Sequence, residues 1–525
     1  MSGFESDEPT YQRRVEVAKQ LSQRFGIELI PPRIPSSNQL DLRTPRISPP
    51  ASLVEFCRQD NWERAYHSYG YDRSDHAVFG RYPNPPDVVA HPRSDAELEA
   101  VLEWCANKSY CVIPYGGGSS VVEGVTPPED RGPIVTVALD ELDQVLEIDE
   151  TSRAARIQAG VFGPHLEDQL RPHGFTLRHF PQSFRDSTLG GWIATRSGGH
   201  YATNHTHIDD LVESVRMLTP RGWWETRRLP GSGAGPDPNR LVIGSEGVLG
   251  VISEAWMRIQ VRPRFRATAG VWFASWEAGY EATRHIVQAK LWPANLRLLD
   301  PELARGTAGL DGAHALLIIG FESSDLSQRS NLTQAVGIAR EGGGIIDDED
   351  MSVDEGTGEA TGRSGAVGAW RQSFIPGGSG GLGEAAGLGL VAGTFESAVT
   401  WQRWPEFDTA VRSATLAALR DVCGGGSVNC RFTHVYTDGP APYYTYLGAW
   451  RAGADPLEQQ RAIKQAASDA IMTAGGTITH HHAVGRQHRP WYDRERPEPF
   501  ADALRGAKLA LDPNGILNPG VLVDP

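Results

Sequence analysis

Cysteine is scarce in this sequence. No two of its five cysteines form a C-x-x-C pair or another zinc-ligand spacing. This argues against a disulfide framework and against a cysteine-based zinc site. The cysteines are Cys57, Cys105, Cys111, Cys423 and Cys430. We therefore expect reduced thiols and a cytoplasmic protein.

Long hydrophobic runs are also absent. No window approaches the roughly 20 consecutive apolar residues that a membrane-spanning helix needs. The N-terminal stretch MSGFESDEPTYQRR lacks the apolar core of a secretory signal. We expect no transmembrane segment, which leaves peripheral contact with a membrane open.

Positive charge is in deficit. The chain has 50 Lys and Arg against 65 Asp and Glu, a formal net charge of -15, and no basic run. A nucleic acid is therefore excluded as a general partner, because phosphate binding needs a basic face. With 40% apolar residues, the 525-residue chain can form two or three domains with large cores.

Helical and strand patterns alternate along the chain, which predicts an α+β protein. In the first part, Ser94 and Glu97 can form a capping box, and a strand over 110–114 runs directly into glycines. The expected segments are an N-terminal extension or cover (1–85), a first α+β domain (86–264), a second α+β domain (265–475) and a C-terminal segment (476–525).

The first chemical signal is PYGGGSSVVEG at 114–124, directly after the predicted strand. Successive glycines let backbone N–H groups turn into one concavity, which suits a pyrophosphate because no side chain blocks close approach. A simple turn is the alternative. The stretch is neither a Walker A loop nor a dinucleotide fingerprint.

Two further segments combine glycines with hydroxyl residues: HFPQSFRDSTLGGWIATRSGG at 179–199 and IGSEGVLGVISEAW at 243–256. Three such segments in this order favour a site where backbone lies flat against a planar ligand. A G-x-G-x-x-G match at Gly378, Gly380 and Gly383 carries little weight, because Pro376 stands where a buried strand should precede it.

The stretch TITHHHAVGR at 477–486 contains three consecutive histidines. On a strand, His480 and His482 would share one face and His481 the other. We expect no metal here, because no cysteine or carboxylate stands at a fitting interval to complete a zinc site. Structural packing and a catalytic cluster both remain open on the residues alone.

Together these segments resemble the FAD flavoproteins of the vanillyl-alcohol oxidase/p-cresol methylhydroxylase type, and more narrowly the alkyldihydroxyacetonephosphate synthases of ether-lipid synthesis. The similarity spans roughly 60–525 and includes PANLRLLD, the HHH run and LDPNGILNPG. It implies an FAD-binding domain of two α+β subdomains at 86–264, an α+β cap domain at 265–475, and a C-terminal segment that returns to the flavin.

The resemblance also implies which residues contact FAD. Pyrophosphate contacts fall on the glycine loop, flavin contacts on the second segment and the remaining contacts on the third. These residues are Pro114, Tyr115, Gly116, Gly117, Gly118, Ser119 and Ser120; Pro181, Ser183, Ser187, Thr188, Gly190, Gly191 and Thr195; and Glu246, Gly247, Val248, Gly250 and Ile252. Ser119 occupies the slot where many superfamily members attach FAD through a histidine, so FAD is expected to be non-covalent. His200 mimics such a histidine but lies in another segment.

For catalysis, the resemblance implies that Tyr443 removes a substrate proton, that His480, His481 and His482 bind substrate and relay a proton, and that Arg297 orients a phosphate-bearing substrate. A phenol with a pKa near 10 needs a neighbour to act as a base at neutral pH. On residues alone, Tyr443, Tyr444 and Tyr446 also fit a packed aromatic strand. The implied reaction exchanges the acyl group of acyl-dihydroxyacetone phosphate for a long-chain alcohol through flavin N5, without net redox change.

Two segments depart from the synthase pattern. A glycine-tyrosine-glycine-like turn is replaced by YATNHTHIDD, with His205 and His207, and a charged cap element by FIPGGSGGLGEAAG. These departures keep a second function open, an FAD oxidoreductase of the same fold acting on a small alcohol, amine or specialised metabolite. A non-enzymatic flavoprotein scaffold is the third alternative. We further expect a homodimer.

Overall fold

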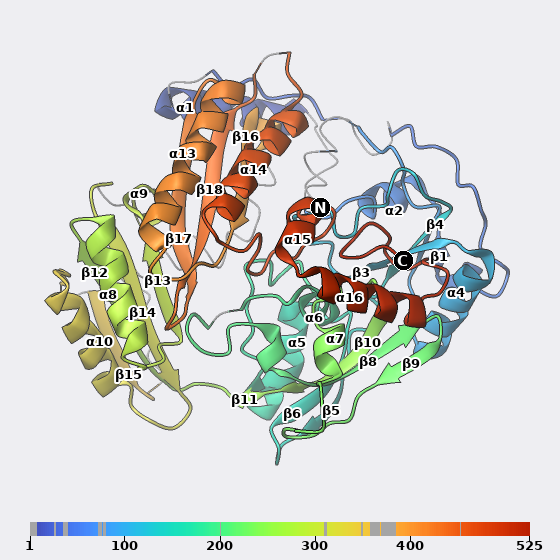
Figure 1. Cartoon of the computed structure of the whole chain (residues 1–525), viewed down its shortest axis with the longest axis horizontal. Coiled ribbons are helices and arrows are strands. Elements are labelled where there is room, and N and C mark those ends of the chain that lie inside the picture. Colours follow the sequence, from blue (N-terminus) through green and yellow to red (C-terminus); the bar gives the residue numbers. More distant parts are fainter. Residues whose placement is uncertain are drawn as a thin grey trace.

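The computed structural model of the chain describes residues 8–25, 28–34, 40–71, 76, 80–199, 201–308, 312–347, 350–357, 368, 385–451 and 453–525. His200 and the glycines of the Gly378–Gly383 match lie outside the described residues. Helices and sheets are mixed throughout the described part (Figure 1), which confirms the predicted α+β class.

The N-terminal segment touches both halves of the molecule. The described part of the chain begins with helix α1 (Glu8–Phe25). Its Ala18 packs with Leu29 and with residues of the last strands of the second half. The chain then crosses to the first half, where it forms η2 (Val54–Phe56), β1 (Cys57–Arg58) and α2 (Asn61–Tyr66). This segment is therefore a cover that bridges the two halves.

The first half contains two main sheets among its described residues. One has the order β1-β2-β4-β3, with β2 (Val88–Ala90) and β3 (Cys111–Tyr115) both parallel to β4 (Ile134–Ala138). Between β2 and β3 runs α4 (Asp95–Lys108), whose predicted cap is confirmed because Ser94 Oγ accepts the Glu97 N–H at 3.3 Å. The glycine loop follows β3 directly.

The other sheet is antiparallel, with the order β5-β6-β10-β8-β9. Its strands are β5 (Val145–Asp149), β6 (Ala154–Gln158), β8 (Val212–Thr219), β9 (Gly222–Glu225) and β10 (Val251–Arg258). A small ribbon pairs β7 (Phe175–Thr176) with β11 (Gln260–Val261). The accompanying helices are α5 (Gly163–Leu170), η3 (Arg171–His173), α6 (Leu189–Thr195), η4 (Ile208–Asp210) and α7 (Asn239–Val242).

The second half is built on an antiparallel sheet of seven described strands in the order β15-β12-β14-β13-β17-β18-β16. The strands are β12 (Phe265–Phe273), β13 (Asn295–Leu299), β14 (Ala315–Ser323), β15 (Met351–Glu355), β16 (Leu390–Glu396), β17 (Gly426–Val435) and β18 (Pro440–Ala449). Helices α8 (Trp276–Gln288) and α10 (Arg329–Glu341) pack beside β12 and β14, while α13 (Trp404–Cys423) packs against β17 and α14 (Pro456–Thr473) against β16 (Figure 1). Short helices α9 (Pro301–Ala308) and η6 (Ala386–Leu388) complete this half.

After α14 the chain returns to the first half. Helices α15 (Arg489–Glu495) and α16 (Glu498–Leu511) lie over that half in Figure 1. Val484, Leu517 and Val521 join the first hydrophobic core, and Leu517 forms a parallel bridge with Val112 beside the glycine loop. The return of the C-terminal segment is thus observed, while the exact domain boundaries stay predictions. None of the described helices is both long and apolar enough to cross a membrane.

We predict that a buried carboxylate anchors the bridging segment. Asp87 has no exposed side-chain area and pairs with Arg43 at 2.6 Å and Arg46 at 2.7 Å. Removing one partner of a buried pair costs about 3–5 kcal/mol, so Asp87→Asn should lower the free energy of unfolding by that order in urea titrations. The exposed Asp130→Asn is the control and should change it by less than about 0.5 kcal/mol.

The same pair sets a pH dependence. Burial alone would raise the pKa of Asp87, but hydrogen bonds from Arg46 and Arg43 lower the pKa to about 2. Because the folded-state pKa lies below the ordinary 3.8, the stabilisation is present above that pH and is lost as pH falls toward about 2. Equal acid sensitivity of the wild type and Asp87→Asn would contradict this account.

Candidate functional site

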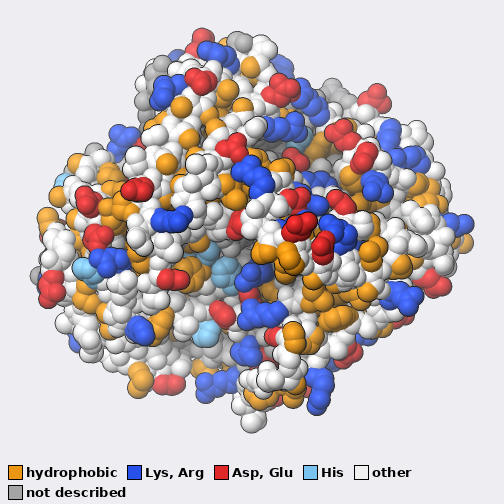
Figure 2. All heavy atoms as spheres, viewed as in Figure 1, with side chains coloured by type: hydrophobic (Ala, Val, Ile, Leu, Met, Phe, Trp, Pro, Cys, Tyr) orange, Lys and Arg blue, Asp and Glu red, His pale blue; other side chains and the backbone are white. Residues whose placement is uncertain are grey.

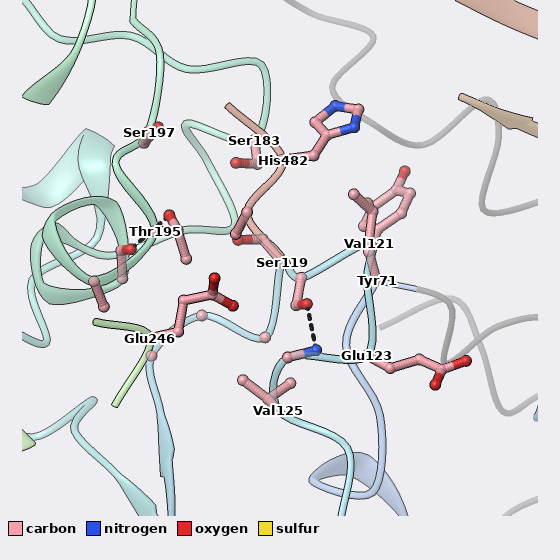
Figure 3. Close-up of a pocket in the computed structure, with 18 of the residues that line it drawn as sticks. Tyr71, Ser119, Val121, Glu123, Val125, Ser183, Thr195, Ser197, Glu246 and His482 are labelled. Atoms are coloured by element: carbon pink, nitrogen blue, oxygen red, sulfur yellow. Dashed lines mark hydrogen bonds between the residues drawn. The ribbon is translucent and has the colours of Figure 1, made fainter. Parts of the chain in front are cut away.

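One cavity lies where the two halves and the C-terminal segment meet. Its walls come from the loop after β3, the loop before α6, the turn before β10, strands β16 and β18, helix α14 and residues 481–487. Figure 3 shows Ser119, Ser183, Thr195, Glu246 and His482 arranged around this space. Segments far apart in the sequence thus contribute to one site.

The glycine loop packs too closely on a neighbouring segment to carry side chains. A Cβ on Gly116 would lie 2.4 Å from Thr188 Oγ1, and one on Gly117 would lie 2.0 Å from the Asp186 carbonyl oxygen. Gly118 has a φ of 65°, in the left-handed region. The glycines therefore leave bare backbone facing the cavity, which is the surface that a flat, pyrophosphate-containing cofactor such as FAD requires.

Most residues expected to hold FAD do line the cavity. The lining set is Pro114, Tyr115, Gly116, Gly117, Gly118, Ser119, Ser120, Pro181, Ser183, Thr188, Gly190, Gly191, Thr195, Glu246, Gly247, Gly250 and Ile252. Ser187 and Val248 are not among the lining residues. Ser187 Oγ accepts the Trp192 Nε1–H at 2.7 Å, and Val248 is fully buried in the first core. Both positions support the walls from behind.

Glu246 connects the cavity to the C-terminal loop. Its carboxylate accepts the backbone N–H groups of Val484 at 2.9 Å and Gly485 at 2.8 Å, while Asn518 Nδ2 donates to its carbonyl at 2.8 Å. Burial raises the pKa of Glu246 to about 7, against the effect of these donors. A carboxyl group in the cavity wall is therefore poised to change charge near neutral pH.

The three histidines do not form the expected strand. Their backbone N–H groups converge on Glu396 at the end of β16, which accepts from His480 at 2.7 Å, His481 at 3.1 Å and His482 at 3.0 Å. Such convergence is incompatible with the alternation of a strand, so the prediction that His480 and His482 share a face is wrong. His481 and His482 line the cavity, whereas His480 is not among the lining residues.

Tyr443 on β18 lies in the cavity wall beside the histidines. Its side chain is 5% exposed, and its ring centroid lies 6.0 Å from that of His481 and 5.2 Å from that of His482. Arg431 on the neighbouring strand places its Cζ 4.1 Å from the ring centroid. Burial raises the pKa of Tyr443, and Arg431 opposes this by favouring the phenolate. The neutral phenol therefore needs a partner to take its proton.

Arg297 on β13 is buried but is not among the residues that line the cavity. Burial lowers the pKa of Arg297 to about 9, and the nearby charge of Arg431 adds to this effect. Arg431 does reach the cavity wall, because its Nη2 donates to Gln182 Oε1 at 2.7 Å. The role of Arg297 in binding a phosphate stays a prediction.

The structure adds residues that the sequence did not single out. Glu396 is 1% exposed and accepts hydrogen bonds from the backbone of the three histidines. His434 on β17 packs against His480 and His481. Nitrogen atoms of His434, His480 and His481 lie within 4.8 Å of one another, a group of possible ligands that sequence spacing did not reveal, and the expectation of no metal stays a prediction. Spacing gave no signal for His434, because the sheet brings it to the loop across a long stretch of chain.

The chain matches two family models. Residues 86–226 match the FAD binding domain, and residues 262–522 match the C-terminal domain of FAD linked oxidases. The first match contains the glycine loop and the segment before α6. The second contains Tyr443 and the three histidines.

Similar proteins cover most of the chain. The alkyldihydroxyacetonephosphate synthase of Dictyostelium discoideum is 27% identical over 92% of this chain and 83% of the relative. The synthase of Caenorhabditis elegans is 29% identical over 85% of this chain and 77% of the relative. The glycolate oxidase subunit GlcD of Bacillus subtilis is 26% identical over 86% of this chain and 91% of the relative.

Solved structures share the fold. A structure of alkyldihydroxyacetonephosphate synthase superposes with a TM-score of 0.77 at 23% identity, covering 96% of this chain and 90% of that one. A structure of p-cresol methylhydroxylase with substrate bound superposes with a TM-score of 0.68 at 14% identity, covering 90% and 94%.

We predict that FAD affinity falls as pH rises through about 7. FAD carries a negatively charged pyrophosphate, so ionisation of Glu246 in the cavity wall should oppose its binding, by up to about tenfold per pH unit above the pKa. In Glu246→Gln the affinity should become nearly independent of pH. Fluorescence titration of apoprotein with FAD at about pH 6 and about pH 8 measures this, and the exposed Glu225→Gln is the control. A wild-type pH dependence in Glu246→Gln would overturn the assignment.

The two matched regions meet at the glycine-lined cavity, and relatives that share both regions extend over most of the chain. The chain therefore combines an FAD binding domain with the C-terminal domain of FAD linked oxidases, as an FAD-dependent enzyme similar to the alkyldihydroxyacetonephosphate synthases.

Proposed function

We propose that this enzyme exchanges an acyl group for an alkyl alcohol on a dihydroxyacetone-phosphate-like substrate, without net redox change. The observation that carries the proposal is the position of Tyr443, which faces the cavity between Arg431 and the rings of His481 and His482. The similarity to the synthases supports the substrate class. The glycine loop and Glu246 would hold FAD, which when bound supplies N5 as an acceptor of a substrate carbon or of a hydride.

The residues of this chain provide the proton transfer. Tyr443 takes the substrate proton as its own phenolic proton moves to an imidazole, because burial makes a free phenolate unfavourable. Arg431, whose Cζ lies 4.1 Å from the centroid of the Tyr443 ring, stabilises the negative charge that develops on the phenol. Glu396 holds the backbone of the histidine loop and so fixes the direction of the rings.

A second candidate is an FAD oxidoreductase acting on a small alcohol, amine or hydroxy acid. The similarity to the glycolate oxidase subunit GlcD favours it, and the same wall residues would remove the substrate proton while hydride is lost. The FAD contacts of the individual residues, the homodimer and the cytoplasmic location stay predictions, as does the peripheral membrane contact that a lipid-like substrate would require.

The visible spectrum of the purified holoenzyme under anaerobic conditions distinguishes the two reactions. For the exchange, acyl-dihydroxyacetone phosphate should bleach the flavin band with release of fatty acid, and a long-chain alcohol should restore the band without any electron acceptor. Bleaching by an alcohol, amine or hydroxy acid that persists until oxygen or another acceptor is added would establish the oxidoreductase instead. A protein that binds no flavin even after incubation with FAD would contradict both.

We predict that Tyr443→Phe abolishes turnover, by at least about 100-fold in kcat, while FAD stays bound, because the change removes only the group that moves the proton. Tyr444→Phe is the matched control on the same strand. Its hydroxyl donates to Asp408 Oδ1 at 2.8 Å in the second core, so this change should lower stability and leave turnover per bound flavin unchanged. Unchanged turnover in Tyr443→Phe would remove Tyr443 from the mechanism.

A further inference from the structure

A line of imidazoles leads away from the cavity. His481 Nδ1 lies 2.9 Å from His480 Nδ1, and His480 Nε2 lies 3.2 Å from His207 Nε2. Both are hydrogen-bond distances, and a hydrogen bond in each contact requires one proton between the two nitrogens. The line joins residue 481 in the cavity wall to residue 207, in the turn where the sequence departs from the synthase pattern.

A backbone carbonyl fixes the tautomer of the outer ring and so sets a direction for the line. The Arg196 carbonyl can only accept, and it lies 3.0 Å from His207 Nδ1, so that nitrogen carries the proton. His207 Nε2 is then an acceptor, which makes His480 Nε2–H the donor to it. His480 Nδ1 is left to accept from His481 Nδ1–H, and the Nε2 of His481 keeps its lone pair.

Neighbouring side chains agree with this direction. The Tyr436 hydroxyl oxygen lies 2.6 Å from His480 Nε2 and 3.0 Å from Thr206 Oγ1, so when it donates to the threonine it shares the His480 N–H with His207. His434 packs on the line with its ring centroid 4.9 Å from that of His480. His434 Nε2 lies 3.3 Å from the Gly199 carbonyl, which can only accept, so its proton is on Nε2.

The outer end of the line lies near solvent. His207 is half-buried, and the adjoining residues Asn204 and His205 are exposed. Figure 2 shows histidine side chains in the hollow between the two halves on that face. Burial lowers the pKa of His207; the Arg196 carbonyl and Asp209 favour a positive charge there, while the Arg196 guanidinium and the ring of His481 oppose it. Asp209 is itself held by Arg196 at 2.8 Å.

We propose that His481, His480 and His207 form a proton relay between the flavin cavity and solvent, with His207 as the outer proton acceptor. A proton that His481 Nε2 takes up in the cavity releases the proton on its Nδ1 to His480 Nδ1. The proton on His480 Nε2 then moves to His207 Nε2. One N–H bond breaks for each that forms, so a single proton leaves the cavity and His207 becomes an imidazolium. The relay serves either reaction under the proposed function.

The first test needs no substrate. In holoenzyme with ¹⁵N-labelled histidine, NMR should find the proton of His207 on Nδ1, that of His480 on Nε2 and that of His481 on Nδ1. Exchange of these ring protons with deuterated solvent should be fast. A proton on Nε2 of His207 would overturn the relay, because His480 could not then donate to it.

The variant His207→Gln distinguishes proton transfer through residue 207 from a purely structural hydrogen bond at that position. The glutamine carbonyl can still accept the His480 Nε2–H, but an amide cannot pass a proton on. Exchange at His480 and His481 should therefore slow by about 10-fold to 100-fold, with the tautomers unchanged. His205→Ala, two residues away and exposed, is the matched control and should exchange like the wild type. Wild-type exchange in His207→Gln would mean that the line is only structural.

A metal centre is the competing use of the cluster. Adding Zn²⁺ to chelator-treated holoenzyme in a calorimeter tests it, with His434→Ala and His480→Ala as variants. If the cluster is a relay, the wild type should not bind Zn²⁺ stoichiometrically at these histidines. Stoichiometric Zn²⁺ binding that is lost in both variants would overturn the relay. Loss of turnover with normal tautomers and exchange would instead count against the proposed function, so the two failures are distinguishable.

Discussion

The site depends on one short loop held by two buried carboxylates, one from each half of the molecule. Glu396 of the second sheet accepts the N–H groups of residues 480–482, and Glu246 of the first half accepts those of Val484 and Gly485. Hydrogen bonds to charged groups contribute about 1.5–3 kcal/mol each, and an unpaired buried donor costs a similar amount. The loop therefore fixes the position of the halves relative to each other at the cavity.

The two carboxylates differ in charge state although both are buried. Burial would raise the pKa of Glu396, but the attraction of His481 outweighs it and holds the pKa well below the ordinary value. Glu246 has only backbone donors and a more distant Arg486, so burial dominates and its pKa rises. Glu396 is therefore a permanent anion beside the histidines, whereas Glu246 is a titratable carboxyl group beside the glycine loop. The electrostatic potential thus differs between these two ends of the cavity.

The proton chemistry of the cavity follows from the same burial. Burial raises the pKa of the Tyr443 phenol, so its proton must move to a neighbour when it acts as a base, and it lies beside a cluster of imidazoles in which burial lowers the pKa of His480 and His482. Neutral imidazoles both donate and accept, which lets them pass a proton on. The cluster draws His207 and His434 from segments on either side of the cavity.

The sequence alone indicated the α+β class, because the periodic patterns and the N-cap at Ser94 have local physical causes, and its resemblance to known flavoproteins implied the cofactor and most of the residues that line the cavity. The same resemblance singled out Tyr443, which lies in the cavity wall. Only the tertiary structure decided the shape of the histidine loop, since the strand expected there gives way to N–H groups that converge on Glu396 from another strand. His434 and Arg431 were beyond reach, and His207 was noted only as a departure from the synthase pattern, because tertiary packing, not spacing along the chain, brings these residues to the site.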